Sequence, residues 1–258
     1  MVPADIHWLA FKRAVVTYTR IPLKVDWQTQ VAPQWSLAYL PWVGLVVGLI
    51  SALPLLVDSW SESLQALLMI LIAMLVTGAF HEDGLLDSAD GLWGGWTVSQ
   101  RLEIMKDSRV GSFGVLAAWG VLSLKWWLLS EWLRVGQWEQ GLWTVFAGWL
   151  AVHMGARLLP LFLIQTLSYV TTEGSKSAAW ISKLSWAQVP ITGAAIVVLL
   201  LLTGVISTIF MAFSLGVLFV VFGWYVKRKL GGYNGDILGA SEQLAEVVIL
   251  FALLGWSA

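Results

Sequence analysis

The chain has 258 residues, of which 58% are hydrophobic and 12% are charged. Soluble domains carry about 25% charged residues, so the composition excludes an ordinary soluble enzyme and indicates a membrane protein. The net charge of −1 offers no basic face for a nucleic acid, and the absence of cysteine excludes disulfides, thiol catalysis and cysteine-based metal sites.

The first 24 residues are expected to form an amphipathic segment that lies in the membrane interface. Apolar side chains here are mixed with cations, as is typical of helices that lie on a membrane. Lys12 and Arg13 interrupt any long apolar run, so no cleavable signal peptide is expected. The motif TRIP, residues 19–22, ends this segment.

Apolar runs along the rest of the chain predict an all-α bundle of about seven transmembrane helices in a single integral membrane domain, residues 1–258. About 20 apolar residues cross the hydrocarbon core of a bilayer. The predicted spans are 37–57, 64–80, 113–133, 142–165, 187–206, 208–226 and 242–258. The fifth and sixth are separated only near Ser207 and Thr208.

The positive charges predict the orientation of these spans. With the N-terminus in the cytoplasm, twelve of the 15 Lys and Arg residues fall on the cytoplasmic side, and only Arg134 falls on the other. Cytoplasmic loops carry this excess of cations. The twelve are Lys12, Arg13, Arg20, Lys24, Arg101, Lys106, Arg109, Lys176, Lys183, Lys227, Arg228 and Lys229.

The sequence HEDGLLDSADG, residues 81–91, opens a polar stretch, 81–112, that is expected to be a cytoplasmic loop. If the helix of the second span continues into it, Asp83, Asp87 and Asp90 fall at i, i+4 and i+7, on one helix face. Like charges on one face repel each other, so a bound cation is predicted to neutralise them. All-oxygen ligands favour Mg²⁺, Mn²⁺ or Ca²⁺, and Mg²⁺ commonly binds a few carboxylates plus substrate phosphates. The alternative is a solvated acidic loop.

Basic residues follow the acids in LEIMKDSRVGSFG, which contains Lys106 and Arg109. A site for phosphoryl transfer needs acidic residues that bind a metal and basic residues that bind phosphates, and the sequence supplies both in this order. The segments around Lys176 and Asp236 are predicted on the same side of the membrane. Arg157 lies inside a span and is expected to bind a phosphate or a carboxylate, since intramembrane charges are usually functional. No partner is predicted for Glu246, which lies in the last span.

Four motifs in order resemble the cobalamin synthase family, also called adenosylcobinamide-GDP ribazoletransferase or cobalamin 5′-phosphate synthase. They are TRIP, EDGLLDSADGLWGG, RLEIMKDSRVGSFG and GGYNGDILGASEQLAE, and the resemblance covers essentially the whole chain. It implies a Mg²⁺-dependent, multi-pass enzyme of the bacterial cytoplasmic (inner) membrane with its active site facing the cytoplasm. The family joins adenosylcobinamide-GDP to α-ribazole or its 5′-phosphate and releases GMP, in the last steps of vitamin B12 biosynthesis. Other cobalamin-assembly enzymes are expected as partners.

The resemblance also suggests roles for individual residues. One carboxylate, with Asp90 as a candidate, is expected to accept the proton of the ribose hydroxyl. The expected catalytic residues are Asp83, Asp87 and Asp90. The expected metal ligands are Glu82, Asp83, Asp87, Asp90 and Asp107. The expected substrate-binding residues are Arg20, Lys106, Arg109, Arg157, Lys176 and Asp236.

Three other classes share some of these features. CDP-alcohol phosphotransferases and membrane prenyltransferases also use clustered aspartates, but their motif spacing is absent here. A cation or proton transporter would use the intramembrane residues as a relay. These residues are Lys125, His153, Arg157 and Glu246.

Overall fold

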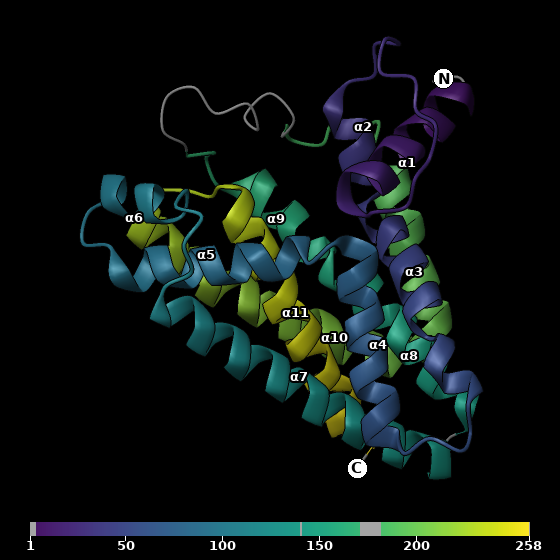
Figure 1. The fold of residues 1–258 in the computed structure, drawn as a ribbon. Helices are drawn as coiled ribbons and strands as arrows, with labels where there is room; N and C mark the ends of the chain where they lie inside the picture. The colour runs from purple at the N-terminus through teal and green to yellow at the C-terminus, as the bar shows by residue number, and fades with distance from the viewer. Residues whose placement is uncertain (1–3, 140, 171–181, 258) are drawn as a thin grey trace.

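The structure is a computed structural model that describes residues 4–139, 141–170 and 182–257. It is a bundle of helices, as predicted, with one isolated β-bridge between Tyr169 and Tyr233 among the described residues (Figure 1). One end of the bundle holds α1, α2 and α6, and α11 ends at the opposite end (Figure 1).

The N-terminal part of the chain forms short helices. They are α1 (Ala4–Tyr18), α2 (Pro33–Ala38), α3 (Leu40–Ser51), the 3-10 turn η1 (Leu53–Leu56) and α4 (Glu62–Thr77).

The remaining helices include the longest apolar ones. They are α5 (Phe80–Gly94), α6 (Val98–Ile104), α7 (Ser112–Glu139), α8 (Leu142–Ala156), α9 (Leu158–Thr166), α10 (Val189–Leu230) and α11 (Gly235–Ser257).

The membrane-protein class is confirmed at a coarse level. Among the described residues, four helical segments are long and apolar enough to cross a membrane, or five if α4 and α5 form one bent span. The first predicted span is divided among the end of α2, α3 and η1, which are all shorter than a membrane span. The fifth and sixth predicted spans form α10, and its non-helical residue is Gly204 (φ 77°), three residues before Ser207.

The helix of the second predicted span does not continue straight into the acidic segment. Gly78 and Ala79 both adopt the left-handed conformation, with φ of 68° and 56°, and α5 leaves α4 at 90°. Left-handed backbone is disfavoured for alanine, so this turn is held by its surroundings. Arg20 donates its backbone N–H to Val76 O (2.7 Å) and its side chain lies directly against Gly78. The stretch 81–112 is therefore largely helical, in α5 and α6, and not a loop.

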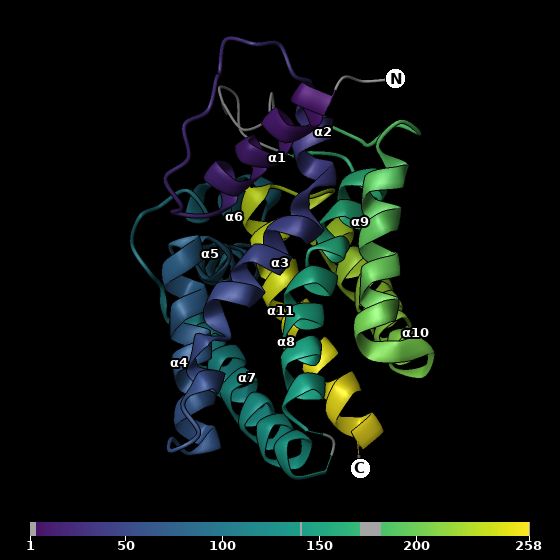
Figure 2. The ribbon, with the colours of Figure 1, turned by 90° about the vertical axis from the view of Figure 1, so that its right-hand side faces the viewer.

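The last helix, α11, runs through the middle of the bundle (Figure 2). It packs against α5, α7, α8 and α10. The contact with α5 is very close, because a Cβ atom on Gly84 would lie 2.8 Å from the backbone oxygen of Asp236 and 3.2 Å from the Cα of Gly239. Glycine at Gly84 and Gly239 thus brings the acidic segment of α5 against the start of α11.

Candidate active site

Carboxylates from two helices meet at the start of α11. Helix α5 carries Asp83, which is exposed, Asp87, which is half-buried, and Asp90, which is buried. The first turn of α11 adds Asp236. The charges of Asp236, Asp83 and Asp90 all act on Asp87. We call Asp83, Asp87 and Asp236 the acidic face.

The donor set of the acidic face fits a hard divalent cation. It consists of carboxylate oxygens, which Mg²⁺ prefers, and the mutual repulsion of these charges is what a cation relieves. Asp236 also accepts a hydrogen bond from Asn234 Nδ2 (2.8 Å), and the positive charge of Lys106 acts on it. Sequence spacing identified the α5 acids, and the family resemblance placed Asp236 among the substrate-binding residues and as a possible ligand of the metal.

Asp90 has a different environment from the acidic face. Its Oδ2 accepts a hydrogen bond from Gly111 N (2.7 Å) and its Oδ1 accepts one from Gly114 N (2.8 Å). A Cβ atom on either glycine would overlap the carboxylate. These amides lie at the N-terminus of α7, where a carboxylate satisfies N–H groups that lack a helical partner. The geometry therefore favours a positioning role for Asp90.

Glu82 points away from Asp83, into the protein. It is 5% exposed, its Oε2 has no hydrogen-bond partner among the described residues, and the charge of Lys125 acts on it. This places the expected metal ligand Glu82 next to the buried charges described below.

Asp107 and Arg109 form an ion pair in the loop between α6 and α7. Arg109 Nη2 lies 2.6 Å from Asp107 Oδ2, and the Arg109 side chain is 87% exposed. Hydrogen bonds from Arg109 lower the pKa of Asp107 to about 2. The Asp107 carboxylate is thus engaged by its neighbour, while Arg109 still faces solvent. Lys176, an expected phosphate contact, lies outside the described residues.

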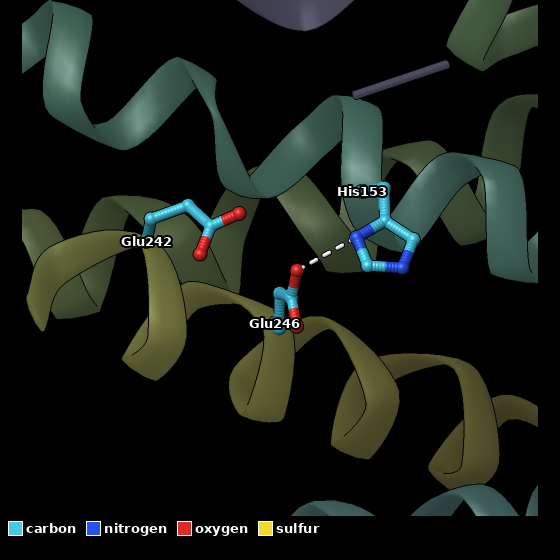
Figure 3. A group of neighbouring side chains, drawn as sticks. All are labelled: His153, Glu242 and Glu246. Carbon is cyan, nitrogen blue, oxygen red and sulfur yellow. Dashed lines mark ion pairs between the residues drawn. The ribbon is translucent and has the colours of Figure 1, made fainter. Parts of the chain in front are cut away.

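A second group of charged side chains is buried in the bundle, around α11. Figure 3 shows Glu242 and Glu246 of α11 beside His153 of α8. Glu246 Oε2 lies 2.6 Å from Lys125 Nζ, and Glu246 Oε1 lies 2.7 Å from His153 Nδ1. The ion pair with Lys125 supplies the partner of Glu246 that the sequence did not reveal.

Arg157 belongs to this buried group. The sequence predicted a phosphate or a carboxylate as its ligand, and the structure gives it a carboxylate. Its Nη1 lies 2.9 Å from Glu242 Oε1 and donates to His153 O (2.8 Å). His81 Nδ1 lies 3.6 Å from Glu242 Oε2. Arg157 is 1% exposed, so it is not part of the acidic face. Glu242 was missed, although its i, i+4 spacing from Glu246 was a usable signal.

The buried group also has the compact geometry of a metal site. Among the described residues, His153, Glu242 and Glu246 are the one group of this kind whose ligand atoms all lie within 4.8 Å of one another. The carboxylates of the acidic face are spaced more widely. Lys125 and Arg157 already neutralise the two buried glutamates, however, and paired charges of this kind need no metal. The carboxylates of the acidic face repel one another, which makes the acidic face the better metal candidate.

Comparison with known proteins gives one consistent family. The family model described as cobalamin-5-phosphate synthase matches residues 10–254. A protein of Shewanella piezotolerans named adenosylcobinamide-GDP ribazoletransferase is 36% identical over 249 residues, which cover 95% of this chain and 94% of that protein. Proteins of the same name from Shewanella oneidensis and Shewanella frigidimarina are each 38% identical, over 92% and 97% of this chain and 90% and 97% of their own. No solved structure matches.

Proposed function

Because the chain belongs to the cobalamin-5-phosphate synthase family, we infer that it is an adenosylcobinamide-GDP ribazoletransferase. A ribose hydroxyl oxygen of α-ribazole, or of its 5′-phosphate, bonds to the phosphorus that joins cobinamide to GMP. The bond from that phosphorus to GMP breaks, and GMP leaves with the electron pair. The product is adenosylcobalamin or its 5′-phosphate.

The observation that carries this function is the family match along nearly the whole chain. The contact between α5 and α11 supports it, because two motifs of the family resemblance meet there. The rival classes, phosphotransferases of the CDP-alcohol type, prenyltransferases and ion transporters, are not favoured by the comparisons.

We propose that Asp83, Asp87 and Asp236 hold Mg²⁺ in this enzyme. When bound there, the ion supplies charge neutralisation for the pyrophosphate. Asp87 is also the carboxylate we assign as the general base for the ribose hydroxyl, through the oxygen that does not bind the ion, because it is half-buried between its acidic neighbours. Asp90 is less suited to that role, since both of its oxygens accept backbone hydrogen bonds.

Three cations are proposed to bind the phosphates. Lys106 acts on Asp236 at the acidic face, Arg20 lies over the turn that starts α5, and Arg109 is exposed in the neighbouring loop. Arginine and lysine bind phosphate oxygens through charge-assisted hydrogen bonds. Lys176 is a further candidate from sequence alone.

We propose that the acidic face lies on the cytoplasmic side of the inner membrane and that the chain crosses the membrane seven times. The basic end of α10 supports this side, because Arg101 of α6 donates to Lys229 O (2.7 Å) and so joins the cationic segment 227–229 to the region next to α5. Clustered cations are typical of cytoplasmic surfaces. The kink at Gly204 would allow α10 to contribute two crossings.

The test of this function is product formation by the purified full-length protein in detergent. The protein is incubated with adenosylcobinamide-GDP, α-ribazole and Mg²⁺, and the products are identified by mass spectrometry. We expect GMP and a cobalamin in equal amounts. GMP formed without a cobalamin, or neither product, would overturn the assignment.

A further inference from the structure

Asn234 lies at the start of α11, two residues before Asp236 of the acidic face, and is buried. Its backbone oxygen accepts a hydrogen bond from Leu238 N (3.3 Å), and its side-chain Oδ1 accepts one from Ile237 N (3.0 Å). These two bonds make Asn234 the N-cap of α11, a position for which asparagine is among the preferred residues. One end of the side-chain amide is therefore fixed by the helix itself.

The other end of the Asn234 amide points to the acidic face. Because Oδ1 is bound to Ile237, Nδ2 is on the side of Asp236, and it donates to Asp236 Oδ2 (2.8 Å). It also donates to Met105 Sδ (3.4 Å), a weaker acceptor at the end of α6. The donor and the acceptor group of this side chain are thus both engaged, which opposes rotation of the amide.

The backbone before Asn234 is held in place as well. Tyr233 forms the isolated β-bridge with Tyr169. The N–H of Tyr233 donates to Ser168 O (2.9 Å), and its carbonyl oxygen accepts from Val170 N (2.8 Å). Hydrogen bonds on both sides of Asn234 therefore set where its amide lies relative to the acidic face.

The amide of Asn234 determines which oxygen of Asp236 is offered to a metal ion. It engages Oδ2 and so leaves Oδ1 for coordination, and groups that hydrogen-bond to metal ligands commonly fix the orientation of those ligands. The amide also connects to the proposed phosphate-binding cations, since Met105 directly precedes Lys106, whose charge acts on Asp236.

We propose that Asn234 is a positioning residue for the metal ion, whose amide turns Asp236 toward Asp83 and Asp87. This inference rests on the metal site of the proposed function. The alternative is that Asn234 only caps α11, in which case any good N-cap residue would serve equally well. The two roles use different atoms of one side chain, Oδ1 for the cap and Nδ2 for Asp236, so a substitution can separate them.

The test is Asn234→Ser in the full-length protein in detergent. Serine is as good an N-cap as asparagine, so α11 keeps its cap, but serine has no amide nitrogen to hold Asp236. Asn234→Ala removes both the cap and the amide. Ser61→Ala is the matched control, because Ser61 is the N-cap of α4, where its side chain accepts from Leu64 N (3.4 Å), and it lies outside the acidic face.

Mn²⁺ is the probe, since Mn²⁺ and Mg²⁺ both bind carboxylate and water oxygens, and electron paramagnetic resonance measures the Mn²⁺ that stays free. We expect Asn234→Ser to raise the dissociation constant for Mn²⁺ about 10–100-fold, the range for loss of a group that supports a metal ligand, with a wild-type thermal midpoint. Asn234→Ala should weaken binding as much and also unfold at a lower temperature. Ser61→Ala should unfold at a lower temperature and bind Mn²⁺ as the wild type does.

Two results would overturn the inference. A wild-type dissociation constant in Asn234→Ser would mean that the residue only caps α11, and equally weakened binding by Ser61→Ala would mean that the loss of any cap suffices. If Asn234→Ser does not fold, Asn234→Thr replaces it, since threonine also caps helices and lacks the amide.

The Mn²⁺ titration contains no corrinoid and no ribazole, which separates this inference from the proposed function. Binding that Asn234→Ser weakens supports the positioning role even if the wild type releases no GMP. Equal binding by both proteins, with normal GMP release by the wild type, would contradict the positioning role and leave the function intact. If the wild type binds Mn²⁺ only with its substrates, the Mg²⁺ concentration for half-maximal GMP release makes the same comparison, and equal values for the wild type and Asn234→Ser would overturn the inference.

Discussion

The carboxylate of Asp90 accepts a 2.8 Å hydrogen bond from the backbone N–H of Gly114, and this contact fixes the start of α7 against the end of α5. Asp90 continues the helical spacing of Asp83 and Asp87, yet its oxygens serve the fold. The acids of HEDGLLDSADG therefore divide into a cap for α7 and an acidic face that meets α11.

Asp90→Ala is expected to destabilise the protein by about 2 kcal/mol, the upper range for loss of a helix cap, because the N–H groups of Gly111 and Gly114 lose their acceptor. The measurement is thermal unfolding in detergent, followed by tryptophan fluorescence. The folded fraction should keep the wild-type Mg²⁺ dependence. Wild-type stability together with a lost Mg²⁺ response would instead make Asp90 a metal ligand.

Asp87→Asn is expected to lower kcat by about 10²–10⁴-fold, the range for loss of a general base, with little change in thermal stability. GMP release by the purified enzyme measures it. Asp58→Asn is the matched control, since Asp58 is an exposed aspartate outside the site, and it should retain full activity. An Asp87→Asn enzyme as active as the control would remove Asp87 from the mechanism.

Gly84→Ala is expected to lower both stability and activity, because the new Cβ would lie 2.8 Å from the backbone oxygen of Asp236 and push α11 away from the acidic face. Gly120→Ala in α7 is the control. No atom lies within 4 Å of a Cβ at Gly120, and alanine favours a helix by about 1 kcal/mol over glycine. Equal thermal stability of the two variants would argue against the close contact of α5 and α11.

Lys125→Met is expected to destabilise the protein by about 3–5 kcal/mol, because it leaves Glu246 buried without its cation. The double variant Lys125→Met, Glu246→Gln should regain much of this loss, since neither charge remains. Thermal unfolding of the wild type, both single variants and the double variant forms the cycle. Additive losses would show that the 2.6 Å ion pair contributes no coupling.

Local spacing was enough to predict the acidic residues of α5, because i, i+4 and i+7 positions share a helix face wherever the helix points. The turn at Ala79 was not predictable, since left-handed alanine depends on tertiary contacts. The position of Asp236 depends on the packing of Gly84 against Gly239, which join segments far apart in the sequence.

For the remaining charged residues, local sequence again indicated a role, while the contacts depend on tertiary packing. The sequence marked Arg157 and Glu246 as intramembrane charges that need partners, but their partners lie on other helices. Composition predicted the helical membrane class. The number of membrane crossings does not follow from composition alone. The helices α3 and η1 are shorter than a usual span, and α10 is one long helix with a kink at Gly204.

The most direct test of the acidic face is the Mg²⁺ concentration that gives half-maximal GMP release by Asp236→Asn, compared with the wild type and Asp58→Asn. If Asp236 joins Asp83 and Asp87 around the ion, this concentration should rise at least about 10–100-fold with the fold intact, because even the loss of a residue that only supports a metal ligand weakens metal binding by that factor. A wild-type value and wild-type kcat in folded Asp236→Asn would contradict the account.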